Sequence, residues 1–186
     1  MNYFTSDWHF GDYRMVNGQN LLLRPFANVV EHDWHIYHSF INSDFKDGDT
    51  LYHLGDVVFD EGNFNNSLLL KIREKYPNSI FKLVIGNYDE SRLVLLKSVF
   101  DEIQREYYLE FKKREIAYLN HYPEKCREKM GLGTFGITGH IHGLWKVKKD
   151  MINVGVDAWH FKPVSEKQIF FVLNAMRNHY DNNVFL

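Results

Sequence analysis

The 186-residue chain has few of the features that mark several classes of protein. It contains a single cysteine, Cys126, so an internal disulfide bond is impossible and a reducing compartment suits it best. No apolar run approaches the ~20 residues that span a bilayer, and the start of the chain lacks the regions of a signal peptide. Only four prolines are present, and no linker divides the chain. We therefore expect a soluble, cytoplasmic protein with one domain over residues 1–186.

The charge balance excludes a second class of protein. Lysine and arginine total 22 and aspartate and glutamate total 24, which gives a formal net charge of -2. Proteins that bind long duplex nucleic acid through its phosphates carry a basic surplus, and this chain has none. We expect no membrane or long-duplex partner, and an anionic substrate must be held by local positive charge, such as that of metal ions. With 45% hydrophobic residues, the chain can still build a sizeable core.

What the chain does contain is a repeated pattern in which a short apolar run leads directly into a polar cluster. Each run has the length and the β-branched or aromatic content of a strand. In open α/β sheets, ligands bind beyond the carboxyl ends of strands, so we expect the clusters to converge on one site. The runs are Tyr3–Ser6, Thr50–Leu54, Phe81–Ile85, Ile116–Leu119 and Phe135–Thr138.

Apolar residues at helical spacing follow each of the first three runs. Another helix is predicted near the end of the chain, where Ser165 and Gln168 form a capping box. The first half thus has the strand–helix–strand order of an α/β fold, and residues 102–154 predict a second, partly antiparallel sheet. The four predicted apolar faces are Val30, Trp34, Tyr37 and Ile41; Leu68, Leu69 and Ile72; Leu93, Leu96 and Phe100; and Ile169, Val172, Leu173 and Met176.

The polar clusters supply side chains that bind divalent metals. Carboxylate and neutral imidazole suit Mn, Fe, Zn and Ni, and a single catalytic zinc takes only three protein ligands. Seven candidates suit a pair of metal ions that share one carboxylate. Such a pair of ions binds both the attacking and the leaving oxygens of a phosphoryl displacement. Asp56, directly after Gly55 at a strand end, is our choice for the shared ligand. The candidates are Asp7, His9, Asp56, Asn87, His121, His140 and His142.

The order of these pieces resembles the calcineurin-like metallophosphoesterases. Each piece alone is a weak signal, but five in the family's order are specific. The runs 153–157 and 162–165 further resemble short bacterial and phage members. The resemblance implies a two-sheet β-sandwich flanked by helices. The pieces D-x-H, G-D, G-N-x-D, a lone histidine and G-H-x-H stand at Asp7–His9, Gly55–Asp56, Gly86–Asp89, His121 and Gly139–His142.

The same resemblance implies a set of ligands and a reaction. A hydroxide that bridges two divalent metal ions would attack phosphorus in line and hydrolyse a phosphate ester. Mn²⁺ is the ion that we expect first, with Fe, Zn and Ni as alternatives. Asp56, Asn87, Tyr88 and His140 are the residues that we expect at the reacting groups. The first metal would be held by Asp7, His9, Asp56 and His142, and the second by Asp56, Asn87, His121 and His140.

Tyr88 departs from the family pattern, which has a histidine here that contacts phosphate and protonates the leaving oxygen. An imidazole with a pKa of about 6.5 is a competent acid near neutral pH, whereas a phenol with a pKa of about 10 is a poor one. Tyr88 can still donate a hydrogen bond, and some small family members with cysteine there act on phosphodiesters. We therefore predict a phosphodiesterase rather than a phosphomonoesterase, with a small-molecule or nucleotide-like substrate.

Several other polar residues have both a functional and an ordinary interpretation. Arg14 and Arg24 suit phosphate, although each could equally be a surface arginine, and His160 in a predicted loop could supply an acid. Asp89 could cap a helix or orient a metal-bound histidine. We expect His53 to be a buried, hydrogen-bonded core residue. The helical histidines expected to form a solvated face are His32, His35 and His38.

Two other functions compete with the phosphoesterase. A non-catalytic interaction scaffold on the same fold is expected to lose several ligands, whereas all seven are intact here. A nuclease that resembles the DNA-repair members would need an added DNA-binding domain, so only a small nucleotide or oligonucleotide remains as a nuclease substrate. The sequence leaves open the substrate itself, the metal and whether the chain forms a homodimer.

Overall fold

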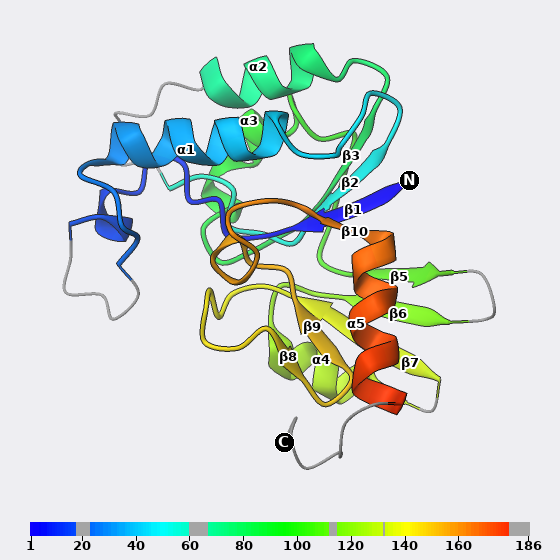
Figure 1. Ribbon diagram of the computed structural model, residues 1–186. Coiled ribbons are helices and arrows are strands. Elements are labelled where there is room, and N and C mark those ends of the chain that lie inside the picture. Colours follow the sequence, from blue (N-terminus) through cyan, green and yellow to red (C-terminus); the bar gives the residue numbers. More distant parts are fainter. Residues whose placement is uncertain (18–22, 60–66, 112–114, 132, 179–186) are drawn as a thin grey trace.

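The computed structural model describes residues 1–17, 23–59, 67–111, 115–131 and 133–178, and two five-stranded sheets form its centre (Figure 1). The first sheet has the strand order β10-β1-β2-β3-β4 and the second has the order β5-β6-β7-β9-β8. The strands of the first sheet are β1 (Asn2–Thr5), β2 (Thr50–His53), β3 (Ile80–Val84), β4 (Glu102–Gln104) and β10 (Val164–Ser165). Those of the second are β5 (Tyr107–Glu110), β6 (Ile116–Leu119), β7 (Thr134–Thr138), β8 (Val147–Lys148) and β9 (Met151–Asn153).

Most of the helices lie on the outer sides of the two sheets, and the last helix of the chain runs from the first sheet alongside the second (Figure 1). α1 and α2 share a core with one face of the first sheet, α4 packs against β6 and β7, and α5 contributes to the core between the sheets. The helices are α1 (Val29–Ile41), α2 (Ser67–Lys75), α3 (Leu93–Leu96), α4 (Pro123–Lys129) and α5 (Glu166–Asn178). Three 3₁₀ turns are η1 (Tyr13–Met15), η2 (Glu90–Arg92) and η4 (Val156–Ala158).

Strand alternation divides the core of the first sheet between its two faces. Tyr3 and Leu51 point to the helical side, whereas Phe4 and Tyr52, one residue later in each strand, point to the second sheet. Between the sheets, Phe4 meets Phe135 and other residues of the second sheet in one buried cluster. Full burial of an apolar side chain of this size is worth about 2 kcal/mol, so this cluster fixes the two sheets against each other.

The predicted α/β order is confirmed, with a second sheet that is antiparallel at both edges. β1, β2, β3 and β4 run parallel, as do β6, β7 and β9, while β5 and β8 are antiparallel to their neighbours. The capping box forms as predicted, because the Ser165 Oγ accepts from the Gln168 amide and the Gln168 Oε1 accepts from the Ser165 amide. Among the described residues, no helix is long and apolar enough to cross a membrane.

The predicted apolar face of α1 is wrong for Val30 and Trp34, whereas Tyr37 and Ile41 pack against the core as predicted. Val30 and Trp34 are 62% and 41% exposed, whereas Ile36, Phe40 and the polar pair His32 and Asp33 are buried. The helix therefore turns two polar residues inward, which a hydrophobic pattern cannot show. The predicted solvated face is wrong for His32 for the same reason, while His35 and His38 are exposed as expected.

The third predicted helix is shorter than its apolar pattern. α3 ends at Leu96, and Phe100 is 5% exposed but lies beyond the helix, in the turns that lead to β4. Its burial in the same cluster as Leu96 preserves the predicted contact without helical geometry. The predicted faces of α2 and α5 are confirmed, because Leu69, Ile72 and Ile169 are fully buried.

Candidate metal centre

The candidate ligands follow strands whose carboxyl ends lie at one edge of the sandwich. Asp7 and His9 follow β1, Asp56 follows β2, and His140 and His142 follow β7. All five have a positive φ, between 50° and 72°, which makes them five of the nine such non-glycine residues described. A left-handed conformation costs a side-chain-bearing residue of order 1 kcal/mol, and such strain gathers at functional sites. The sequence predicted extended entry into a turn at Asp7–His9, and the left-handed geometry was not visible in it.

Two glycines let the ligand segments approach each other. A Cβ at Gly86 would lie 2.6 Å from the backbone nitrogen of Asp56 and in contact with its carboxylate. A Cβ at Gly139 would collide with Ser6 and lie 2.9 Å from the Asp7 Oδ2. The glycines of the motifs are therefore required by space around the two carboxylates.

The first group of candidate ligands lies close enough to hold one ion and consists of Asp7, His9 and His142. Their ligand atoms all lie within 4.8 Å of one another, and the His9 and His142 rings stack at 4.9 Å. His9 Nδ1 lies 3.2 Å from the Asp12 carboxylate, and His142 Nδ1 lies 3.1 Å from the Asp157 carboxylate. An ionised carboxylate only accepts, so each Nδ1–H donates and each Nε2 is left for a metal.

The ligand atoms of the second group also lie within 4.8 Å of one another, and this group consists of Asp56, His121 and His140. His121 is buried, and its Nδ1 donates to the Leu54 carbonyl oxygen at 2.6 Å. Its Nε2 lies 3.3 Å from Asp56 and 3.1 Å from the Asn87 Oδ1. Burial by itself would lower the pKa of His121, but the hydrogen bond to Asp56 and the charge of Asp7 outweigh it and raise the pKa to about 9.

Asp56 lies between the two groups. Its Oδ2 is 3.3 Å from the Nε2 of His121 and 3.7 Å from the Nε2 of His9. Burial is the largest single influence and opposes its ionisation, yet the hydrogen bond from His121 and the charges of His121 and His9 together outweigh it and lower the pKa of Asp56. The position matches that of a carboxylate shared by two ions.

The buried polar atoms test whether metal ions fit. The His9 Nε2 is buried and has no hydrogen-bond partner among the described residues, although it faces Asp56 and lies 4.0 Å from Asp7. An unpaired imidazole nitrogen between two carboxylates is costly in a protein interior, and a divalent cation satisfies all three groups. The two groups therefore fit two divalent metal ions.

Asp89 stabilises the backbone that carries Asp56. Its buried carboxylate accepts from the backbone amides of Asp56, Val57 and Gly86, which ties the end of β2 to the end of β3. It caps no helix with its side chain, and it touches the backbone of the Asp56 segment rather than a histidine. Neither the helix cap nor the support of a histidine considered from the sequence applies, and the contacts of Asp89 are instead those of a residue that holds the backbone of the site.

Tyr88 and Arg14 lie together at the border of the first group. The Tyr88 ring is 5.6 Å from the His9 ring, and its backbone amide donates to Asp56 at 3.1 Å. The Arg14 guanidinium lies 4.9 Å from the centre of the Tyr88 ring and 3.5 Å from that of Phe59. Arg14 also donates two hydrogen bonds to the Asp12 carboxylate. The same carboxylate accepts from the Nδ1 of His9, so Asp12 connects Arg14 to the first group.

Three other sequence expectations have definite outcomes. Arg24 is 3% exposed and fully engaged inside the protein, so it is neither a surface residue nor a phosphate contact. His160 is exposed, and no contact joins it to either group within the described ranges. His53 is buried as expected, but neither ring nitrogen has a hydrogen-bond partner in the described part of the chain, and burial lowers its pKa to about 3.

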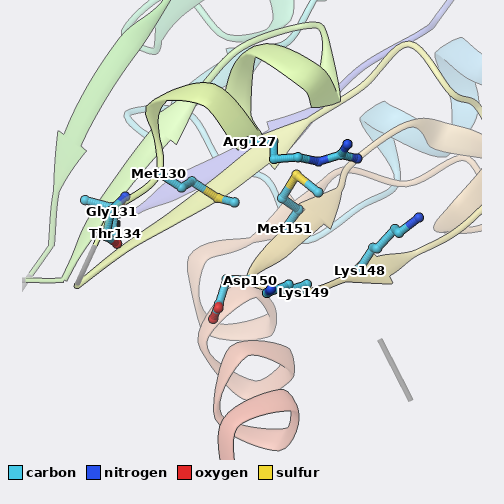
Figure 2. Close-up of a pocket in the computed structure, with 8 residues that line it drawn as sticks. All are labelled: Arg127, Met130, Gly131, Thr134, Lys148, Lys149, Asp150 and Met151. Carbon is cyan, nitrogen blue, oxygen red and sulfur yellow. Dashed lines mark hydrogen bonds between the residues drawn. The ribbon is translucent and has the colours of Figure 1, made fainter. Parts of the chain in front are cut away.

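A hollow of about 510 Å³ lies away from the metal centre, between α4 and the β8–β9 hairpin (Figure 2). Met130 and Met151 cover Gly136, since a Cβ there would lie 3.1 Å from each side chain. Arg127, Lys148 and Lys149 also line it. This hollow adjoins Thr134 at the start of β7, whereas the candidate ligands His140 and His142 follow the end of that strand, so it forms a separate feature.

Comparison with known proteins gives a structural relative without an assigned role. No family profile matches the chain, and no curated protein matches it. The protein of unknown function AQ665 from Aquifex aeolicus is 28% identical, with a TM-score of 0.70 over 92% of this chain and 98% of that one. The nuclease MPE from Pseudomonas putida is 16% identical, with a TM-score of 0.46 over 76% of this chain and 60% of that one. The second likeness is too distant to indicate a function.

Proposed function

We propose that this chain is a dinuclear, metal-dependent phosphodiesterase. The observation that carries the proposal is the position of Asp56, whose carboxylate faces the Nε2 atoms of both His9 and His121. The His9 Nε2 is buried and has no hydrogen-bond partner among the described residues, and coordination of a cation would satisfy it. Phosphate-ester hydrolysis is the chemistry for which a pair of adjacent divalent ions is best suited.

The ligand assignment follows the two groups. Asp7, His9 and His142 would hold one ion, His121, His140 and Asn87 would hold the other, and Asp56 would be shared. Bound ions would neutralise the phosphate and lower the pKa of a bound water, with Mn²⁺ as the ion that we expect first.

The residues beside the ligands suit binding of a diester more than protonation of a poor leaving group. Tyr88 packs on His9, where its hydroxyl can donate a hydrogen bond to a substrate oxygen. A phenol is a poorer proton donor than an imidazole at neutral pH, so good leaving groups are favoured. The exposed His140, with Tyr122 at 4.9 Å, forms the solvent side of the second group and gives a small substrate access to it.

A metal-supplemented assay tests the proposal. Purified protein with Mn²⁺ is offered bis(4-nitrophenyl) phosphate and 4-nitrophenyl phosphate, beside Asp56→Asn as the control. We expect turnover of the diester to exceed that of the monoester, and a loss of about a thousandfold or more in the variant, because the shared ligand contributes several kcal/mol. Activity on neither ester above the level of Asp56→Asn would overturn the enzyme proposal and favour the scaffold.

A short oligonucleotide extends the assay to the small-nuclease alternative. The same protein and the same Asp56→Asn control are incubated with a single-stranded oligonucleotide and with a long duplex. We expect any cleavage to be confined to the short strand, because the formal charge of -2 gives no surplus for duplex binding. Efficient cleavage of the duplex would contradict the expected small substrate.

A further inference from the structure

Arg24 is buried between the first group and helix α1, and its guanidinium is fully occupied. Nε and Nη2 each donate to the Asp157 carboxylate at 2.8 Å, a two-point contact with fixed geometry. Nη2 also donates to the Asp7 carbonyl oxygen at 2.6 Å, and Nη1 donates to that of Trp8 at 3.0 Å. The remaining Nη1 bond goes to the Nε2 of His32 at 2.7 Å. Five donors thus meet five acceptors, and none is left for a substrate.

Asp157 links this guanidinium to a metal ligand. The Oδ2 atom that accepts from Arg24 also lies 3.1 Å from the Nδ1 of His142. The carboxylate keeps the proton of His142 on Nδ1 and the ring in one orientation, with Nε2 towards Asp7 and His9. His142 needs such a restraint, because its backbone is left-handed with a φ of 50°.

A second branch reaches the Asp7 segment and the helix. The two carbonyl oxygens bound by Arg24 belong to consecutive residues that precede His9, and Asp7 has a φ of 60°. On the other side, His32 donates through Nδ1 to Asp33 at 2.8 Å, and Asp33 accepts from the Gly11 amide at 3.0 Å. The chain segments before and after His9 are therefore both attached to the same buried network.

We propose that Arg24 and Asp157 are positioning residues that preassemble the first group and set its metal affinity. The inference rests on the proposed two-metal site. Burial of an ion pair by itself adds little stability, because desolvation offsets the attraction between the charges. What the network does provide is a fixed orientation for His142 and for the strained Asp7 segment. Its removal therefore weakens the ion of the first group and leaves that of the second group unchanged.

Calorimetric titration of the metal-free protein with Mn²⁺ tests this, because it reports affinity without activity. The variants are Asp157→Ala, which removes the acceptor, and Asp157→Asn, which keeps one acceptor but loses the second bond to Arg24. We expect the affinity of one ion to fall 10–100-fold in Asp157→Ala and by less in Asp157→Asn, with the other ion within about twofold of wild type. Should Asp157→Ala not fold, Asp157→Asn carries the test alone.

Two controls separate positioning from general effects. Asp47→Asn removes the same charge at an exposed turn, where the carboxylate accepts hydrogen bonds from the backbone amide and the side chain of Asn78. Ser165→Ala removes the hydroxyl of the capping box and lowers stability without touching either group. We expect both to bind two ions with wild-type affinity. An equal loss in these variants would assign the effect to charge or stability and overturn the inference.

A double-mutant cycle identifies the ion that is affected. Since the direct contact of Asp157 with a ligand is with His142, and only the Arg24 branch to the Asp7 segment remains without it, Asp157→Asn should cost much less affinity in a His142→Ala background than in the wild type. Additive losses, or an equal weakening of both ions in Asp157→Asn, would overturn the positioning role while leaving the two-metal proposal intact. A wild-type protein that binds no Mn²⁺ would instead overturn the proposed function itself, so the two failures are distinguishable.

Discussion

The two groups of the metal centre are built differently. In the first, His9 and His142 each have a carboxylate behind the ring, and an arginine holds each carboxylate in place. In the second, His121 has only the Leu54 carbonyl oxygen behind it, and His140 is exposed. One half is thus rigid and enclosed, and the other is open to solvent.

This difference predicts that the two proposed ions would differ in binding affinity and in access to solvent. A carboxylate behind an imidazole raises its basicity and fixes its direction, so the first group should bind its ion more tightly. The carboxylates remain ionised, because Asp157 is hydrogen-bonded by His142 and Arg24, which outweigh burial and hold its pKa well below the usual range. The second group, with its exposed histidine, is the half that solvent can reach, and under the proposed function it is the half that would admit a substrate.

Removing one ligand from each group gives the largest expected effect. In His142→Ala the tighter ion should lose at least about a hundredfold in affinity, whereas in His140→Ala only the weaker ion should be affected, because a ligand contributes several kcal/mol. Mn²⁺ titration of both variants, with bound metal counted by elemental analysis, measures this. The comparison fails if the two variants weaken the same ion.

Asp12→Asn alters the carboxylate behind only one of the two histidines of the first group, so it should lower metal affinity less than removal of a ligand. Asparagine can still accept from the His9 Nδ1, but it loses the charge and one of the two bonds to Arg14. We expect affinity for the tighter ion to fall about tenfold, at the low end of the 10–100-fold range for such partners. The exposed Asp47→Asn variant is again the matched control. A loss at the weaker ion instead would show that Asp12 does not belong to the first group.

Tyr88→His tests the substrate side, and its expected effect is no larger than that of Asp12→Asn. The imidazole would stand beside His9 at the place of a phenol and act as a better acid near neutral pH. Turnover of an alkyl phosphate monoester should rise by about tenfold, with little change for the aryl diester, whose leaving group needs no proton. Tyr88→Phe, which removes only the hydroxyl, is the control. Unchanged or lower monoester turnover in Tyr88→His would count against the role given to Tyr88.

Local patterns in the sequence sufficed for much of the fold. The strand runs at Thr50–Leu54 and Ile116–Leu119 match β2 and β6 to within a residue, because short buried strands show as apolar runs. The capping box at Ser165 was also readable, since its two partners are three residues apart. The face of α1 was not, because Trp34 is exposed and His32 is buried in a network formed by residues distant in sequence.

The sequence by itself determined the types of the candidate ligands, their order and their places after strands, since these depend on residue identity and local pattern. Only the tertiary structure decided how those ligands divide into two groups with Asp56 between them. It also turned Arg24 from a candidate phosphate contact into an internal support that joins residues up to 133 positions apart. Such contacts depend on the packing of two sheets and a helix, and no local pattern encodes that packing.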